Sequence, residues 1–253
     1  MKIDGTGAIV TGASSGIGAI TALELARRGA KVMVVARRAD KLEQAAEACR
    51  RYTPDSFALP GDVSDQGFCA TAVAKAAESF GSVDIVVNNA GVSLHKHTAD
   101  VTVDEFDRVM GVNFSGPVYL ATAALGGMLE RRKGALINVT SVSGYVPNPK
   151  EAVYGASKAA LSRWSHGLSV DLHGTGVHVG VLSPGPIDTE IWLTEGEEPY
   201  KGRLYPPAIV ATGIVRMIER ELTHMTVPRR FGAVGALYPV VGRPLRWGMR
   251  RYA

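Results

Sequence analysis

The chain has 253 residues, of which 46% are hydrophobic, 29 are glycine and 2 are cysteine, and its formal net charge is +4. This length and apolar content suit one large α/β domain with a substantial core, and no second domain is needed. Cys49 and Cys69 have no CxxC or histidine spacing, which argues against a disulfide or metal site. His95 and His97 are expected on the polar surface, so we predict no metal.

The positive charge is concentrated in a basic C-terminal tail, residues 228–253, which holds six arginines and no acidic residue. Its uncharged stretch, 231–242, is too short for the roughly 20 residues that span a bilayer. We expect the tail to pack on the domain or on a second subunit, with a membrane-surface or acidic-partner contact as the alternative. Nucleic-acid binding is not expected, because no recognised module accompanies the charge. The N-terminus shows no signal segment, so a cytoplasmic location is expected.

Apolar runs alternate with helical patterns along the chain. The patterns predict strands near 7–11, 31–35, 56–59, 84–87, 134–140 and 177–182, and helices near 16–28, 40–51, 66–80, 103–132, 152–173 and 206–222. Continuous apolar strands are typical of a parallel sheet that helices cover on both faces. We therefore predict a single α/β domain over residues 1–253 with a doubly wound parallel sheet, and ligands at the carboxyl ends of its strands.

A glycine-rich turn follows the first predicted strand and reads Thr11-Gly12-Ala13-Ser14-Ser15-Gly16-Ile17-Gly18. Glycines allow tight backbone geometry, let a pyrophosphate approach the main chain and leave N–H groups free at the positive end of the next helix. The turn therefore predicts a dinucleotide cradle formed by Gly12, Ser14, Ser15, Gly16, Ile17 and Gly18.

The residues after the second predicted strand bear on the choice of cofactor. An enzyme that selects the unphosphorylated cofactor usually places an acid here, whereas this chain reads Ala36-Arg37-Arg38. A guanidinium offers charge and a forked set of donors to a 2′-phosphate. We therefore predict NADP(H) rather than NAD(H), with Arg37 and Arg38 at the phosphate. The alternative is that both arginines are solvated at a helix start.

Tyr154 and Lys158 lie four residues apart in a predicted helix, so their side chains project from one face. A phenol has a pKa of roughly 10, and a neighbouring cation typically lowers it by about 1–3 units. We therefore predict that Lys158 lowers the pKa of Tyr154, so that the phenol exchanges a proton near neutral pH.

These features, with Asn88-Asn89-Ala90-Gly91 after the fourth strand and Ser141 thirteen residues before Tyr154, resemble the short-chain dehydrogenase/reductase family over essentially the whole chain. The resemblance implies a Rossmann-like fold, a nicotinamide cofactor, a homodimer or homotetramer, and a catalytic centre of Ser141, Tyr154 and Lys158 assisted by Asn113. It also implies cofactor contacts from Tyr154, Lys158, Asp62, Val63, Asn89, Ala90, Gly91, Pro184, Gly185, Ile187 and Thr189. For Asp62, helix capping is the alternative.

Asn113 has a physical argument of its own. It lies within the predicted helix 103–132, and Pro117 cannot donate the N–H that would satisfy the Asn113 carbonyl. We predict a kinked or broken helix here, and a bound water that could join Asn113 to Lys158.

The predicted activity is NADP(H)-dependent hydride transfer between nicotinamide and the carbonyl or secondary alcohol of a small molecule. Residues 189–205 are predicted to form a substrate lid, and a partly apolar substrate is indicated by Val142, Tyr145, Val146, Ile191 and Trp192. Two alternatives stay open: a non-catalytic NADP(H)-binding regulator on the same fold, and a membrane-surface-associated reductase of a lipid-like substrate.

Overall fold

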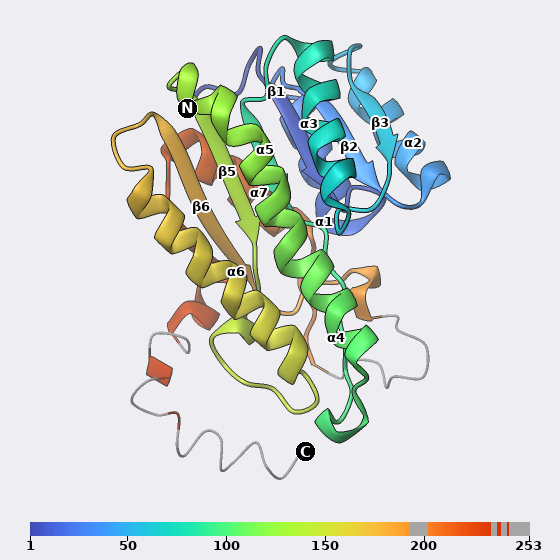
Figure 1. The fold of residues 1–253 in the computed structure, drawn as a ribbon, viewed down its shortest axis with the longest axis vertical. Helices are drawn as coiled ribbons and strands as arrows, with labels where there is room; N and C mark the ends of the chain where they lie inside the picture. Colours follow the sequence, from blue (N-terminus) through green and yellow to red (C-terminus); the bar gives the residue numbers. More distant parts are fainter. Residues whose placement is uncertain (193–201, 234–236, 239–241, 243–253) are drawn as a thin grey trace.

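A seven-stranded parallel sheet organises the part of the chain that this computed structural model describes, residues 1–192, 202–233, 237–238 and 242 (Figure 1). The strand order is β3-β2-β1-β4-β5-β6-β7. The strands are β1 (Gly7–Thr11), β2 (Lys31–Ala36), β3 (Phe57–Pro60), β4 (Ile85–Asn88), β5 (Gly134–Val139), β6 (Val177–Pro184) and β7 (His224–Val227).

The helices α1 to α7 connect or flank these strands. They are α1 (Gly16–Ala26), α2 (Ala39–Arg50), α3 (Gln66–Phe80), α4 (Val103–Met110), α5 (Gly116–Glu130), α6 (Ala152–Asp171) and α7 (Ala208–Arg220). Shorter 3-10 turns are η1 (Thr98–Asp100), η3 (Val142–Gly144) and η4 (Glu190–Trp192), and a π-helical segment is η2 (Gly111–Ser115). The predicted Rossmann-like α/β fold is therefore confirmed.

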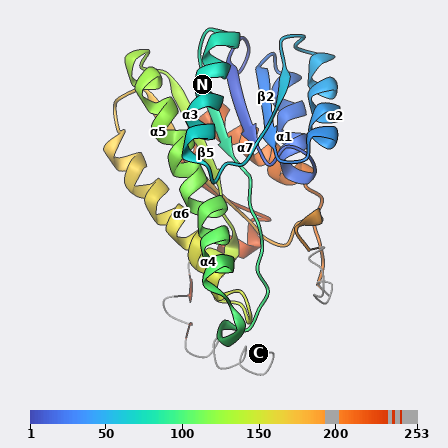
Figure 2. The ribbon, with the colours of Figure 1, turned by 45° about the vertical axis from the view of Figure 1, so that its right-hand side comes forward.

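Two apolar cores lie on opposite faces of the sheet, because successive residues of a strand point to opposite sides. In β1, Ala8 and Val10 belong to one core and Ile9 to the other. The first core includes buried residues of α1, α2 and α7, and the second includes residues of α3 and α5 (Figures 1 and 2). Every residue of β1, β4 and β5 is buried, as expected for central strands covered on both faces.

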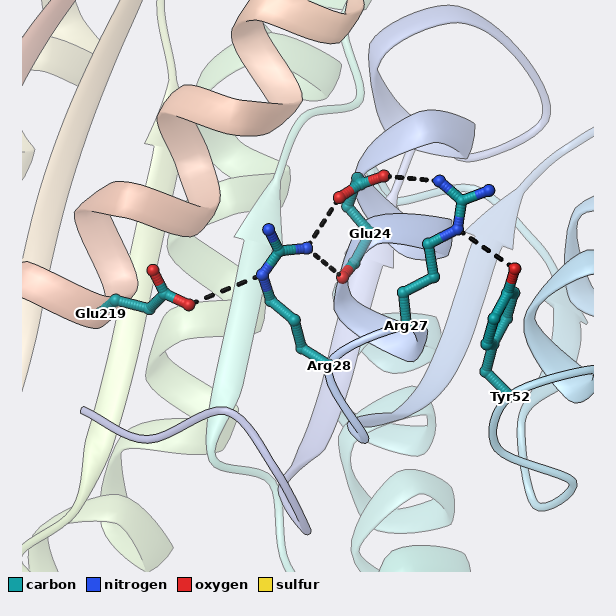
Figure 3. A network of polar contacts seen from close by, with 5 residues as sticks. All are labelled: Glu24, Arg27, Arg28, Tyr52 and Glu219. Atoms are coloured by element: carbon teal, nitrogen blue, oxygen red, sulfur yellow. Dashed lines mark hydrogen bonds and ion pairs between the residues drawn. The ribbon is translucent and has the colours of Figure 1, made fainter.

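Polar contacts also join α1 to its neighbours (Figure 3). Arg28 donates from Nη1 to Glu24 Oε2 at 2.7 Å, and its Nε lies 3.5 Å from Glu219 Oε1 on α7. Arg27 donates from Nε to the hydroxyl of Tyr52 at 3.3 Å. These groups are partly exposed, and such ion pairs contribute about 0–1 kcal/mol. The apolar core therefore sets the position of α1, and the ion pairs refine it.

The predicted helix over 103–132 is divided in the structure. It is α4 and α5 joined by η2, in which the N–H of Gly116 bonds to the carbonyl of Gly111, five residues earlier. Pro117 supplies no N–H and occupies the first turn of α5, where none is required. The predicted break is confirmed, and its form is a π-helical widening.

Strand β7 was not predicted. Its four residues, His224-Met225-Thr226-Val227, are partly polar, and only Thr226 is buried. The strand is fixed by its pairing with β6, in which Val181 is opposite His224 and Pro184 is opposite Val227. A short, mixed segment of this kind carries no periodic signal of its own.

The reversal of strand order places a crevice between β1 and β4. From β1 the chain moves outward through β2 and β3, and from β4 it moves the other way through β5 to β7. Ligands of such sheets bind at this point, beyond the carboxyl ends of the strands. Thr11, Asn88, Val139 and Pro184 are the last residues of the strands that converge there.

The described residues contain no group of three potential metal ligands, and both cysteines are free and buried. Among the described helices, none combines the length and apolar character needed to cross a bilayer.

Candidate active site

The glycine turn is locked against the end of β4 by hydrogen bonds. Thr11 Oγ1 accepts from the backbone N–H groups of Asn89 and Ala90, both at 3.0 Å. The Asn89 side chain donates from Nδ2 to the Thr11 carbonyl at 2.9 Å. These contacts bring two separate segments of the chain to one wall of the crevice. The Asn88-Asn89-Ala90-Gly91 motif therefore holds the start of the glycine turn in place.

The glycines in this turn meet two different requirements. Gly12 and Gly16 have φ angles of +65° and +54°, a region that favours glycine. Gly18 is needed for close packing, because a Cβ there would lie 2.3 Å from the Gly12 carbonyl oxygen and 2.7 Å from Asn89 Nδ2. The turn therefore leaves its backbone accessible to a ligand while α1 begins immediately behind it.

A cavity of about 950 Å³ extends from this turn to the end of β5 and the start of α6. It joins nearly all the predicted site residues: Gly12, Ser14, Ser15, Gly16, Ile17, Arg37, Arg38, Asp62, Val63, Asn89, Ala90, Gly91, Ser141, Tyr154, Lys158, Pro184, Gly185, Ile187 and Thr189. The predicted residues that do not line it are Gly18, which packs behind the turn, and Asn113, which is fully buried.

The outer end of the cavity is rich in cations. Arg37 and Arg38 follow β2 and are both exposed. Arg38 donates from Nη2 to the hydroxyls of Ser14 and Ser15, at 2.9 and 3.0 Å. Its Nη1 lies 2.6 Å from Glu190 Oε2. Arg38 is therefore engaged by the glycine turn and by the segment that follows β6.

Asp62 lines the same end of the cavity. Its Oδ1 accepts from the backbone N–H and the hydroxyl of Ser64, at 2.9 and 2.8 Å. The capping of α3 itself is performed by Asp65, whose side chain accepts from the N–H of Phe68. Asp62 thus stabilises the turn before α3. Both of these contacts use Oδ1, and neither uses Oδ2.

The inner end of the cavity is formed by β5 and α6. Ser141 follows β5 with an extended backbone, and its Oγ accepts from the N–H of Ser143 at 3.1 Å. Tyr154 lies in the first turn of α6 and is hydrogen-bonded to the Ser141 side chain. Lys158, one turn later, is 3% exposed and donates from Nζ to the Val139 carbonyl at 3.1 Å. Serine, phenol and amine therefore meet at one place.

The prediction that Lys158 brings the pKa of Tyr154 toward neutrality is wrong for the protein alone. Burial raises the pKa of Tyr154 to about 12, the hydrogen bond from Ser141 opposes this, and the negative charge of Glu151 adds to it. Burial likewise lowers the pKa of Lys158 to about 8. The Nζ atom lies 6.0 Å from the centroid of the Tyr154 ring, so the amine faces the ring, and removal from water opposes the charged form of both groups.

Asn113 fixes the backbone beside Lys158. Its Oδ1 accepts from the N–H of Val92 at 2.9 Å, and its Nδ2 donates to the Val92 carbonyl and to Ser157 Oγ, both at 3.0 Å. A Cβ on Gly91 would lie 3.2 Å from Lys158 Nζ and 3.4 Å from Asn113 Oδ1. The structure therefore places Asn113 near Lys158, with its side chain holding the segment after β4, and the water between them stays a prediction.

His95, which was expected on the polar surface, is instead partly buried and has an acidic partner. Its Nε2 lies 2.6 Å from Oε1 of Glu151, a buried residue three positions before Tyr154. Asn148 donates to the other oxygen of Glu151 at 2.7 Å. Burial opposes ionisation of Glu151, but hydrogen bonds from His95, Asn148 and Ser143 outweigh it and hold the pKa of that carboxyl below its usual range.

The remaining predictions concern the substrate end and the basic tail. Val142, Val146 and Ile191 line the cavity as expected, whereas the Tyr145 hydroxyl is turned toward Ser162 and Ser183 and is hydrogen-bonded to both, at 3.1 and 3.0 Å. The Trp192 side chain and residues 193–201 of the predicted lid lie outside the described residues, as does most of the basic tail: 234–236, 239–241 and 243–253.

Besides His95, four cavity residues with charged or aromatic side chains were not predicted as site residues: Arg108, Glu151, Glu190 and Phe231. Glu151 could have been found from its position one helical turn before Tyr154, because i and i+3 side chains share a face. Phe231 packs so closely on Gly185 that a Cβ there would lie 2.8 Å from its ring. No local pattern identifies Phe231, since its place depends on β7.

Comparisons with known proteins agree with this arrangement. Residues 6–199 match the short chain dehydrogenase family, and the chain belongs to it. An uncharacterized oxidoreductase of Staphylococcus aureus (strain MRSA252) is 41% identical over 188 residues, which cover 74% of this chain and 80% of the relative.

Solved structures of the same fold include a short chain dehydrogenase/reductase from Burkholderia phymatum in complex with NAD, with a TM-score of 0.88 at 23% identity over 96% of both chains. A metagenomic short-chain oxidoreductase in complex with NADP has a TM-score of 0.78 at 25% identity, covering 90% of this chain and 98% of that one. The protein is therefore an oxidoreductase of the short-chain dehydrogenase family.

The packing of Gly18 leads to a test of the turn. We expect Gly18→Ala to destabilise the protein by about 1–3 kcal/mol, because the added methyl overpacks the Gly12 carbonyl. Gly126→Ala is the matched control. Gly126 lies on α5 with nothing within 4 Å of an added Cβ, so we expect the free energy of unfolding to rise by about 0.5–1 kcal/mol. Urea denaturation followed by circular dichroism measures both, and equal stability of Gly18→Ala and the wild type would contradict this role.

Proposed function

We propose that the protein is an NADP(H)-dependent oxidoreductase that interconverts a carbonyl and a secondary alcohol on a partly apolar small molecule. The observation that carries this proposal is the continuity of one cavity. A glycine turn and two arginines lie at its outer end, and Ser141, Tyr154 and Lys158 lie at its inner end. A binding module without chemistry would not require the inner set, and no described feature favours a purely regulatory role.

The cavity fits a nicotinamide dinucleotide. Gly12 and Gly16 leave the backbone open where a pyrophosphate would meet the first turn of α1, and the positive end of that helix favours an anion. Asp62, Val63, Ile187 and Thr189 also line this cavity. Asp62 and Val63 would contact the adenine, and Ile187 and Thr189 would contact the carboxamide side of the nicotinamide. One solved relative is in complex with NAD and another with NADP, so the choice between the two is argued from this chain's own residues.

Arg37 and Arg38 support NADP(H). A 2′-phosphate carries a charge of about −1.5 to −2 and three acceptor oxygens, which guanidinium groups match in charge and geometry. The end of β2 holds no acid in this chain; it is followed by Arg37, Arg38 and Ala39. A 2′-phosphate at this turn would therefore meet two cations. The ribose of an unphosphorylated cofactor would find no carboxylate in this turn to hold its 2′-hydroxyl.

The inner residues divide the work of proton transfer. A nicotinamide cofactor held in this cavity would supply or accept the hydride at the carbon of the carbonyl or alcohol. In reduction, Tyr154 gives its proton to the carbonyl oxygen while Ser141 donates a hydrogen bond to the same atom. Lys158 supplies positive charge near the phenolate that remains, and in oxidation Tyr154 takes the proton back. The raised pKa of Tyr154 keeps the phenol protonated at neutral pH, which suits reduction.

The substrate end combines apolar and polar walls. Val142, Val146 and Ile191 supply apolar surface, whereas His95 and Asn148 supply polar groups around Glu151. This combination favours a substrate with an apolar body and a polar group beyond its carbonyl. A screen of NADPH consumption against ketones, quinones, steroids and acyl thioesters would identify the class.

Tyr154→Phe tests the catalytic assignment. We expect NADPH to bind as in the wild type and turnover to fall by about 10²–10⁴, because only the proton-transferring hydroxyl is lost. Tyr145→Phe removes a phenol hydroxyl that does not line the cavity, so it should retain activity. Steady-state rates and NADPH fluorescence titrations measure the two effects, and full activity of Tyr154→Phe would refute the assignment.

Arg37→Asp tests the choice of cofactor. We expect its affinity for NADPH to fall about tenfold or more, since a charge-assisted contact is replaced by repulsion, while the affinity for NADH stays level or rises. Arg51→Asp makes the same change of charge on an exposed residue at the end of α2, away from the cavity, and should leave the ratio of the two dissociation constants unchanged. An unaltered ratio in Arg37→Asp would show that Arg37 is solvated surface.

The pKa values predict the dependence of reduction on pH. Below about pH 8 the phenol is protonated and the amine is charged, whereas above it the amine loses its proton first. We therefore expect the single-turnover rate of carbonyl reduction to be constant below about pH 8 and to fall at higher pH, because the cation that stabilises the phenolate is lost. A rate that rises through pH 8 would contradict this. Stopped-flow measurement with saturating NADPH separates the effect from product release.

A further inference from the structure

The segment after β6 crosses the outer end of the cavity and is held on both sides. Ile187 forms a bridge with Tyr205, and Thr189 lies against the glycine turn, 3.0 Å from the position of a Cβ on Gly16. On the other side, Ser93 Oγ donates to the carbonyl of Ile191 at 3.0 Å. Glu190, between these contacts, is thereby carried to the mouth of the cavity at the end where Arg38 lies.

Three donors from two segments, the start of α2 and the glycine turn, converge on the Glu190 carboxylate. Arg38 Nη1 lies 2.6 Å from Oε2, and Lys41 Nζ, in the first turn of α2, lies 2.8 Å from Oε1. Ser15 of the glycine turn donates from Oγ to Oε2 at 3.0 Å. Hydrogen bonds from Lys41, Arg38 and Ser15 hold the pKa of this carboxyl at about 2, so it is an anion throughout the neutral range.

This donor set is the one that a phosphate monoester requires. A guanidinium, an ammonium and a hydroxyl donate equally well to carboxylate or to phosphate oxygens. The two anions cannot use the same donors together without mutual repulsion. A ligand with a phosphate at this end of the cavity must therefore displace Glu190, whereas a ligand with a free ribose hydroxyl leaves the Glu190 contacts intact.

We propose that Glu190 is a cofactor-specificity residue that competes with the 2′-phosphate of NADP(H) for Arg38 and Lys41. The proposal rests on the proposed function, because it requires the adenosine end of a nicotinamide cofactor to lie beside these residues. Glu190 weakens the binding of NADP(H) and leaves the binding of NAD(H) unaffected. It therefore reduces the preference for NADP(H) over NAD(H) that Arg37 and Arg38 create. The three side chains are 41–44% exposed, so water screens the competition and the effect is modest.

Glu190→Gln tests the proposal, because the amide keeps the shape of the side chain and removes its charge. The matched control is Glu43→Gln, which removes an exposed carboxylate that pairs with Arg50 on the same helix as Lys41 and does not line the cavity. Dissociation constants are measured by fluorescence and calorimetry for NADPH and NADH, and for the fragments adenosine 2′,5′-bisphosphate and adenosine 5′-monophosphate. Thermal melting of each variant verifies that it is folded.

We expect Glu190→Gln to bind NADPH and the bisphosphate about threefold to tenfold more tightly, with NADH and the monophosphate unchanged within about twofold. Glu43→Gln should change none of the four. An unchanged or weaker affinity for NADPH, or an equal gain for NADH, overturns the competition while the proposed function stands. Failure of the wild type to bind either dinucleotide overturns both, so the two failures are distinguishable.

Discussion

The burial of one amine constrains the whole inner end of the cavity. Lys158 is 3% exposed, and its Nζ is placed by the carbonyl of Val139 at the end of β5. Space for it depends on Gly91, where any Cβ would approach Nζ to 3.2 Å. Removal of an ammonium from water disfavours its charge, and the pKa of about 8 leaves it a cation at neutral pH by a narrow margin. Helix α6, the end of β5 and Gly91 therefore act together to hold the Lys158 amine in a buried position.

Charge is balanced differently at the two ends of the cavity. At the outer end, Arg38 and Lys41 are exposed and face Glu190, so their cations are neutralised by a group that another anion can replace. At the inner end, Glu151 is buried and pairs with the half-buried His95, and its negative charge contributes to the raised pKa of Tyr154, which favours the protonated phenol. The outer end is thus suited to the replacement of the Glu190 carboxylate by another anion. The inner end is suited to keeping the Tyr154 phenol protonated before it transfers its proton.

Most of the fold and of the site could be predicted because their signals are local. The central strands are continuous apolar runs, and Gly12, Gly16 and Gly18 stand at a fixed spacing directly after the first strand, so pattern alone identifies them. The pairs Glu151–His95 and Glu190–Arg38 join residues 56 and 152 positions apart, and only the folded topology brings them together. The direction of the Tyr154 pKa was missed for a related reason: the pair spacing reveals a neighbouring charge, whereas the extent of burial, which dominates here, is a tertiary property.

The most direct test of this account is the pKa of Lys158 in the protein without ligand. It can be measured by NMR titration of protein labelled with carbon-13 at the lysine ε positions, with the signal assigned by its loss in Lys158→Met. We predict a midpoint of about 8 for the pKa of Lys158. A midpoint near the ordinary lysine value of about 10.4 would show that the amine is hydrated, and would contradict the arrangement on which the proposed chemistry depends.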